Sequence, residues 1–177
     1  MRVFLAIEIE QNDAIVEIIK KISALTINQR IVTRQNSHLT VKFFGEKNPD
    51  EVELINNTIM KKIDSIKPFT ITLRGIGYFG DRRSPHVLWI GIDPSDELKK
   101  LYDMVALLFG SDREATPHLT ISRIKYGKLH DMTLLMNIIE QYKDVKFNTV
   151  TVNEIVLKES ILERHGAIYR TLYNYSF

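Results

Sequence analysis

The tripeptide His-Leu-Thr occurs twice in this chain, each time followed by a β-branched apolar residue, and this repetition limits the folds that the sequence can adopt. Residues 38–41 read His-Leu-Thr-Val, and residues 118–121 read His-Leu-Thr-Ile, at an offset of 80. Two further segments, beginning at Val3 and Val87, match at an offset of 84. A nearly constant offset predicts a duplicated β-α-β-α-β unit, because the period is too long for a solenoid and two copies suit a pseudo-twofold pair.

Apolar runs and amphipathic stretches alternate along both halves of the chain. Helices are expected to begin near Asn12, Pro49, Asp93 and Asp131, where capping residues, proline or an acidic residue precede apolar residues at helical spacing. Short runs rich in branched residues predict strands. These strands are expected at residues 2–9, 37–44, 69–73, 86–92, 117–124, 147–157 and 166–175.

This order of elements predicts an α+β fold made of two pseudo-symmetric β-α-β-α-β lobes. Their sheets are expected to be mainly antiparallel and to face a central cleft, with the helices outside. Residues 1–177 would form a single domain, with lobes at approximately 1–83 and 84–177. The C-terminal strand either stays with the second lobe or returns to the first, and the pattern leaves both possibilities open.

Each copy of the tripeptide is expected to place a histidine beside a hydroxyl. Residues i and i+2 of a strand point to the same face, so His38 projects with Thr40, and His118 with Thr120. The residues between them point to the core. If a twofold axis relates the lobes, two imidazoles and two hydroxyls converge on one cleft.

Such a group of side chains suits phosphodiester chemistry without a metal. Histidine has an unperturbed pKa of about 6.5, so a neutral imidazole can accept a proton while a protonated one donates a proton to a leaving oxygen. Threonine hydroxyls can donate hydrogen bonds to phosphate oxygens as their charge increases. A single strand histidine would more often be structural, but the second copy in a matching element favours a catalytic pair.

Composition excludes several other kinds of site. The chain has no cysteine, which removes disulfides, thiolate nucleophiles and cysteine-based metal centres. The net charge of +2, from 24 basic and 22 acidic residues, permits a local basic cleft but not a histone-like cationic surface. No apolar run approaches the ~20 residues that a membrane-spanning helix needs, and the N-terminus does not resemble a signal peptide. We therefore expect a cytoplasmic protein with no metal and no cofactor.

The two motifs resemble those of a known superfamily. Residues 38–45, His-Leu-Thr-Val-Lys-Phe-Phe-Gly, and residues 117–123, Pro-His-Leu-Thr-Ile-Ser-Arg, are similar to the paired signatures of the two-histidine phosphoesterases. Within that superfamily the chain most resembles the 2′-5′ RNA ligase, or RNA 2′,3′-cyclic phosphodiesterase, family. The resemblance extends over essentially the whole chain, including residues 77–80 and 87–91 and the tail from Ser160.

The resemblance implies hydrolysis of a 2′,3′-cyclic phosphate at an RNA 3′ end to a 2′-phosphomonoester. It also implies a ligation in which a 5′-hydroxyl attacks the cyclic phosphate and leaves a 2′-5′ linkage. His38 would match the general acid and His118 the general base, with Thr40 and Thr120 holding the phosphate. The pseudo-symmetry of the residues leaves the acid and base roles open, so this assignment rests on the resemblance. The implied partners are RNA ends, with tRNA fragments as one candidate source, and the chain is expected to be a monomer.

Four further residues are candidates for substrate binding. Arg123 occupies a position that is often basic in the family, although strand parity turns it away from His118 unless a bulge intervenes. Lys42 shares parity with Thr40 and could extend the basic floor. Tyr78 and Phe79 offer a stacking face for single-stranded nucleic acid. For each of these residues, an ordinary surface or core role explains the pattern equally well.

Other functions remain compatible with the sequence. The same chemistry could act on a small cyclic nucleotide or on a 2′-5′ oligonucleotide. Alternatively, the duplicated sheet could be a non-catalytic RNA-binding module. Intact histidine and threonine in both motifs count against this last alternative, because arginine or lysine serves simple phosphate binding better.

Overall fold

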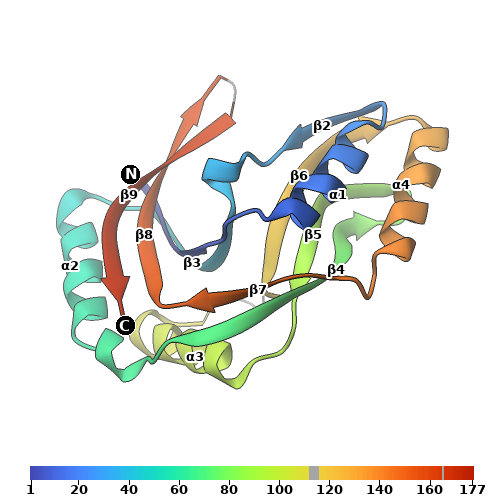
Figure 1. Ribbon diagram of the computed structural model, residues 1–177. Coiled ribbons are helices and arrows are strands. Elements are labelled where there is room, and N and C mark those ends of the chain that lie inside the picture. Colours follow the sequence, from blue (N-terminus) through green and yellow to red (C-terminus); the bar gives the residue numbers. More distant parts are fainter. Residues whose placement is uncertain (112–115, 165) are drawn as a thin grey trace.

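A computed structural model describes residues 1–111, 116–164 and 166–177 (Figure 1). In chain order its elements are β1 (Arg2–Glu8), α1 (Asp13–Ser23), β2 (Ile27–Ile31), η1 (Arg34–Asn36), β3 (His38–Glu46), α2 (Pro49–Met60), η2 (Ile63–Ser65), β4 (Phe69–Asp81), β5 (Ser84–Ile92), α3 (Asp96–Phe109), β6 (His118–Gly127), α4 (Leu129–Gln141), β7 (Lys146–Val152), β8 (Glu154–Glu163) and β9 (Gly166–Ser176). The elements η1 and η2 are single 3₁₀ turns.

Helix starts follow the capping signals in the sequence. The side chain of Asn12 accepts a hydrogen bond from the backbone N–H of Ile15 at the start of α1. At α2, Asn48 and Glu51 form a reciprocal capping box, and Pro49 occupies the first turn. These side chains satisfy backbone donors that would otherwise lack a partner at a helix N-terminus. Both helices therefore begin where the sequence predicted.

The strands form one antiparallel sheet. Over the described residues it has nine strands in the order β7-β4-β5-β6-β3-β1-β8-β9, with β2 paired to the free part of β6. The central pair, β3 and β6, is joined only through Leu39 and Leu119. The α+β class with antiparallel strands is thus confirmed, and the two expected sheets are connected through the two motif strands.

Each half of the sheet combines strands from both halves of the sequence. Strand β4 pairs with β5 and β7, whereas β8 pairs with β1 and β9. The four strands on either side of the centre are therefore β9-β8-β1-β3 and β6-β5-β4-β7. Strand β4 is separated from the central β6 by β5, and β8 is separated from the central β3 by β1. The duplicated arrangement arises from this exchange of strands between the two halves of the sequence.

All four helices pack on one face of the sheet. Figure 1 shows α2 at one end beside β9, α1 and α4 at the other end, and α3 below the middle. Apolar residues of every helix belong to one buried cluster with alternate residues of the strands, among them Leu39 and Leu119. Truncating either leucine to alanine would cost about 2–5 kcal/mol of stability, as for other buried leucines. The helices therefore leave the opposite face of the sheet free to form a cleft.

Several features of the chain differ from the expected elements, and one is that β4 continues to Asp81, well past the end expected at residue 73. Residues 27–31 form β2, a half-buried edge strand whose polar residues gave no clear strand pattern. The expected strand at 147–157 is two strands, because the chain breaks at Asn153 between β7 and β8. Asn153 accepts a backbone hydrogen bond from Phe177, and the strands on its two sides pair with different partners. The polar pair Asn153 and Glu154 inside the expected strand was the available signal of this change of partner.

In the described part of the chain, no helix is both long and apolar enough to cross a membrane.

Candidate active site

The two motif strands bring both histidines to one cleft. Because Leu39 and Leu119 are paired and buried, the flanking residues of each strand point to the opposite face of the sheet. The antiparallel register around this pair places His38 toward Thr120 and Thr40 toward His118. All four of these side chains line the same cleft. The sequence-based prediction of one shared group therefore agrees with their placement.

Both imidazoles are held in the same way. The Nδ1 atom of His38 lies 2.7 Å from the carbonyl oxygen of Asn36, and Nδ1 of His118 lies 2.7 Å from that of Thr116. A carbonyl oxygen can only accept, so Nδ1 carries a proton in each ring. In both rings Nε2 is then left for proton transfer, as a base when neutral and as an acid when protonated.

Different aromatic rings surround the two histidines. His38 lies 5.0 Å from the ring of Phe4 and 5.1 Å from that of Tyr169, measured between ring centroids. His118 makes an edge contact of 4.8 Å with Phe79 and lies 6.2 Å from Trp89. These contacts restrict the orientation of each imidazole and shield one side of it from water.

The Trp89 ring fits beside His118 because the residue that faces it, Gly77, has no side chain. It pairs with Gly77 across β5 and β4, and a Cβ atom at Gly77 would lie 2.1 Å from the Trp89 ring. Any other residue at position 77 would displace the indole. The glycine therefore helps to position the aromatic wall beside His118.

Burial changes the proton affinity of one histidine. Desolvation lowers the pKa of His38 below its usual value, and the positive charges of Lys158 and Arg123 lower it further. The carbonyl of Asn36 and the carboxylate of Glu8 act in the opposite direction. The net result favours a neutral His38 imidazole in the free protein.

A β-bulge follows each motif threonine and changes the face on which later residues lie. In β6, Thr120 pairs with Trp89 and Ser122 with Leu88, so Ile121 is the extra residue. Arg123 consequently returns to the face of His118, lines the cleft and contributes to the electrostatics of His38. Simple strand parity was therefore wrong for Arg123, and the bulge brings it into the site.

The matching bulge in β3 has the opposite consequence for Lys42. Ala6 pairs with Thr40 and Leu5 with Lys42, which makes Val41 the extra residue. Because Leu5 belongs to the core face, Lys42 lies on that face too, and its ammonium group donates a hydrogen bond to the carbonyl of Gly110 at the end of α3. The parity argument that gave Lys42 the same strand face as Thr40 was wrong, although Lys42 is among the residues that line the cleft. Phe43 takes the position on the cleft face instead.

Tyr78 and Phe79 point to opposite faces of β4. Tyr78 pairs with the buried Leu88 and packs against the main core, whereas Phe79 lines the cleft and contacts His118. Of the two aromatic residues proposed for substrate binding, only Phe79 reaches the site. Adjacent strand residues alternate between faces, so both could not.

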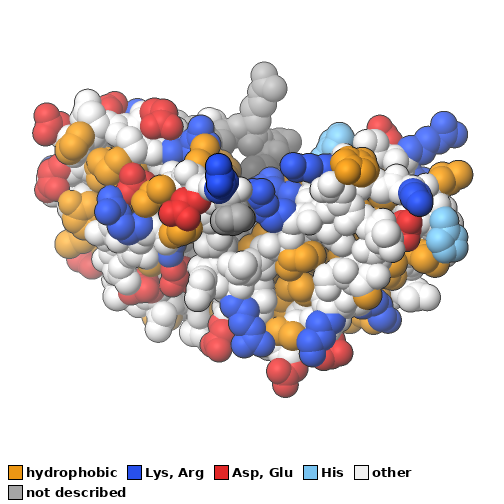
Figure 2. All heavy atoms as spheres, turned by 90° about the horizontal axis from the view of Figure 1, so that it is seen from above, with side chains coloured by type: hydrophobic (Ala, Val, Ile, Leu, Met, Phe, Trp, Pro, Cys, Tyr) orange, Lys and Arg blue, Asp and Glu red, His pale blue; other side chains and the backbone are white. Residues whose placement is uncertain are grey.

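Sequence reasoning missed Arg30. It pairs with Arg123 across β2 and β6 and lines the same cleft. The side chain also lies next to Gly166, whose added Cβ would be 3.6 Å from an Arg30 guanidinium nitrogen. In the view from above, Figure 2 shows Lys and Arg side chains grouped around the middle of the molecule. The exposure of Asn28 and Arg30 between half-buried neighbours exists only in the folded strand, so no clear signal in the sequence identified this position.

An ion pair between the buried Lys158 and the exposed Glu8 lies on the cleft face beside His38. The ammonium group of Lys158 contacts the carboxylate of Glu8 and donates a 3.0 Å hydrogen bond to the Thr171 hydroxyl. Glu8 is the partner of His38 across β1 and β3. The Lys158 side chain is only 5% exposed, so its charge acts in a poorly hydrated region. A lysine directly after the apolar residues Ile155, Val156 and Leu157 was the available signal.

Among residues 1–111, 116–164 and 166–177, no group of three histidine, aspartate or glutamate side chains is arranged to hold a metal ion. The chemistry available in the cleft comes from two imidazoles, two hydroxyls and the guanidinium groups of Arg30 and Arg123. Such a site can bind a phosphate anion and exchange protons with groups on either side of it.

Sequence comparisons point to a single family. The model described as the 2′-5′ RNA ligase superfamily matches residues 12–160. A Methanocaldococcus jannaschii protein named RNA 2′,3′-cyclic phosphodiesterase is 35% identical over 97% of this chain and 98% of its own length. A Thermotoga maritima protein of the same name is 30% identical over 100% of this chain and 96% of its own length.

Solved structures share the fold. A crystal structure of a Thermus thermophilus protein superposes with a TM-score of 0.80 at 22% identity, covering 99% of this chain and 97% of that one. Escherichia coli LigT in complex with phosphate gives a TM-score of 0.72 at 22% identity, over 99% of this chain and 96% of LigT. At these identities the likeness establishes the architecture.

Proposed function

The chain belongs to the 2′-5′ RNA ligase superfamily, and from this premise we propose that it is an RNA 2′,3′-cyclic phosphodiesterase. It opens a terminal 2′,3′-cyclic phosphate to a 2′-phosphomonoester. The observation that carries the proposal is the pair of imidazoles in one cleft, each with Nδ1 bound to a carbonyl and Nε2 left for proton transfer.

We assign the proton transfers to the two histidines. Nε2 of His118 removes a proton from a water molecule as its oxygen attacks phosphorus, and the bond from phosphorus to O3′ breaks. Nε2 of His38 gives its proton to the departing O3′. The number of protons balances, because His118 gains one proton while His38 loses one, and exchange with solvent restores both rings.

The remaining side chains stabilise the negative charge on the phosphate. The hydroxyls of Thr40 and Thr120 donate hydrogen bonds to the non-bridging oxygens as their charge grows in the transition state. Arg123 supplies a fixed positive charge, and its forked donors suit a phosphate. With groups of this kind in the cleft, the site is expected to act without a metal.

If His38 is the acid, its imidazole must be protonated when the substrate is bound. The lowered pKa of His38 keeps its imidazole neutral in the free protein. An anionic phosphate close to the ring would raise that pKa, because a nearby negative charge favours the imidazolium. His38 would then take up its proton as the substrate binds.

The reverse-type ligation uses the same groups with a 5′-hydroxyl in place of water. A small cyclic nucleotide or a 2′-5′ oligonucleotide is the main alternative substrate, since the same groups would act on either. RNA 3′ ends with cyclic phosphates are the substrate class we propose, and tRNA fragments are one source of them. A cytoplasmic location and a monomeric state stay predictions.

The decisive experiment measures turnover of an oligonucleotide with a 2′,3′-cyclic phosphate end in EDTA, with the product isomer identified. Wild-type protein is expected to form the 2′-phosphate. His38→Ala and His118→Ala should each reduce kcat by about 10²- to 10⁴-fold, while the matched control His130→Ala keeps its rate. A near wild-type rate in either site variant, with the fold intact by circular dichroism, would refute the two-histidine mechanism.

A further inference from the structure

Strand β6 continues well beyond the reaction centre. After Arg123 it runs to Gly127, and along this part it pairs with β2. The pairs are Arg123 with Arg30 and then, beyond Ile124 and the extra residue Lys125, Tyr126 with Asn28. Tyr126 therefore lies two pairs from Arg123, which corresponds to about 7 Å along a strand.

Tyr126 and Asn28 lie on the same face of the sheet as the reaction centre. The intervening Gln29 faces the helices, because its amide accepts a 2.7 Å hydrogen bond from the buried Ser122 and donates to the carbonyl of Ile22 in α1. Its neighbours Asn28 and Arg30 must point the other way, and each shares its face with its partner on β6. Arg30 lines the cleft that contains the histidines. The cleft face therefore continues from His118 to Tyr126.

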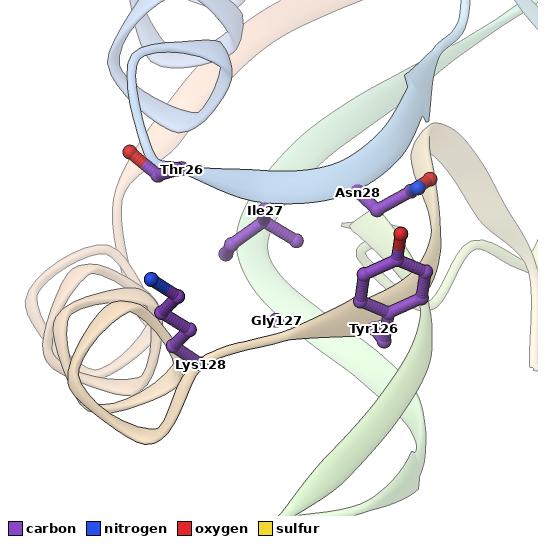
Figure 3. Close-up of a pocket in the computed structure, with 6 residues that line it drawn as sticks. All are labelled: Thr26, Ile27, Asn28, Tyr126, Gly127 and Lys128. Atoms are coloured by element: carbon purple, nitrogen blue, oxygen red, sulfur yellow. The ribbon is translucent and has the colours of Figure 1, made fainter.

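A small pocket lies at the end of this strand pair, where Asn28 and Tyr126 of the cleft face meet Ile27 and Gly127, which face the helices. Figure 3 shows Tyr126 and Asn28 on one side of it and Lys128 on the other, with Ile27 and Gly127 between them. Its volume is about 400 Å³, within the ~300–1,000 Å³ of small-molecule sites. The Tyr126 side chain is 68% exposed although it is large and partly apolar.

We propose that Tyr126, with Asn28 and Lys128, forms a separate nucleobase subsite that holds RNA one or two nucleotides upstream of the cyclic phosphate. This inference rests on the proposed function and extends it, because it makes the substrate an oligonucleotide of at least two or three residues rather than a cyclic mononucleotide.

The chemistry of the surface fits single-stranded RNA. An exposed tyrosine ring can stack on any base, and the Asn28 amide offers both a donor and an acceptor to a base edge. Arg30 and Lys128 supply positive charge on either side of the ring for the phosphates that connect successive nucleotides. A protein partner would gain little from this small, basic and open pocket.

The test compares substrates that carry the same cyclic end and differ in length. Wild-type protein is assayed on a 2′,3′-cyclic mononucleotide and on di-, tri- and tetranucleotides that end in the same nucleotide. We expect kcat/KM to rise by about 5- to 150-fold between the mononucleotide and the trinucleotide, the range for one stacked base. Tyr126→Ala should remove this gain and leave the mononucleotide rate unchanged.

Two further variants and one modified substrate separate stacking from other effects. Tyr126→Phe keeps the ring and should keep the gain, and Leu107→Ala, at an 84% exposed position on α3, should change nothing. A trinucleotide with an abasic residue at the second or third position from the cyclic end should behave on wild-type protein as the mononucleotide does.

The outcomes distinguish the two proposals. If wild-type protein hydrolyses every length at the same rate, or Tyr126→Ala slows all lengths equally, the subsite is wrong and the phosphodiesterase stands. If wild-type protein opens none of the cyclic ends, the proposed function itself has failed.

Discussion

The two lobes contain the same β-bulge but carry different side chains after it. In both, one extra residue follows the motif threonine and rotates the next residues of the strand. The position three residues after the threonine then faces the cleft, and it is Phe43 in β3 but Arg123 in β6. Phe43 is 63% exposed, whereas Arg123 lies close enough to lower the pKa of His38. The bulge therefore decides that a side chain enters the site, and the residue type decides what it does there.

The residues around the two histidines also differ at equivalent positions of the two lobes. Across from Thr40 lies the small Ala6, and across from Thr120 lies the large Trp89. The buried Lys158 and the exposed Glu8 lie on the side of His38. The aromatic rings of Phe79 and Trp89 lie beside His118. A pseudo-symmetric framework thus gives two chemically equal rings different surroundings, and those of His38 lower its pKa.

The largest expected loss of activity comes from changing the threonines, which both lobes have in common. Thr40→Val and Thr120→Val each remove one hydroxyl and keep the shape of the side chain. If both hydroxyls hold the phosphate, each variant should lower kcat by about 10²-fold, with little change in thermal stability. Steady-state kinetics on the cyclic-phosphate oligonucleotide measures this. A large loss in only one lobe would mean that the phosphate is not shared between them.

A smaller loss of activity is expected at the position where the two lobes carry different residues, Arg123 and Phe43. Arg123→Ala should lower kcat/KM by about 10- to 100-fold, the amount expected for a hydrogen bond to a charged group. Phe43→Ala, at the matching position of the other lobe, serves as the control and should stay within about twofold, because single surface side chains contribute little. Equal losses in the two variants would contradict a phosphate-binding role specific to Arg123.

The smallest effect concerns the pKa of His38, measured by NMR titration of its ring proton. Lys158→Met removes a positive charge that opposes protonation, so the pKa of His38 should rise toward its ordinary value. Glu8→Gln removes a charge that favours protonation, so that pKa should fall further. Lys20→Met, on the exposed face of α1, is the control and should leave it unchanged. Shifts of the same sign in both site variants would show that the pair acts only through the fold.

The same variants also identify the role of His38. In kcat/KM the basic limb of a bell-shaped pH profile reports the acid of the free enzyme, and the acidic limb reports the base. If His38 is the acid, Lys158→Met should move the basic limb to higher pH. If the acidic limb moves instead, the roles of His38 and His118 must be exchanged.

Residues close together in sequence could be placed without coordinates. Asn12 and the box formed by Asn48 and Glu51 fixed helix starts, because capping depends on residues within one turn. The alternation within His-Leu-Thr put a histidine and a threonine on one face, because that periodicity is a property of the strand itself. The repeat of the motif, together with the absence of cysteine, was enough to predict two imidazoles and two hydroxyls as the reacting groups.

Other features depended on which strands become neighbours. The bulges after Thr40 and Thr120 exist only in relation to β1 and β5, so parity misplaced Lys42 and Arg123. Arg30 reaches the cleft, and Lys158 comes close enough to act on His38, because β2 pairs with β6 and β8 with β1. The sequence by itself determined the identity and local orientation of the proposed reacting groups. Tertiary structure decided the charges and rings around them, because those groups come from strands that meet only when distant segments pair.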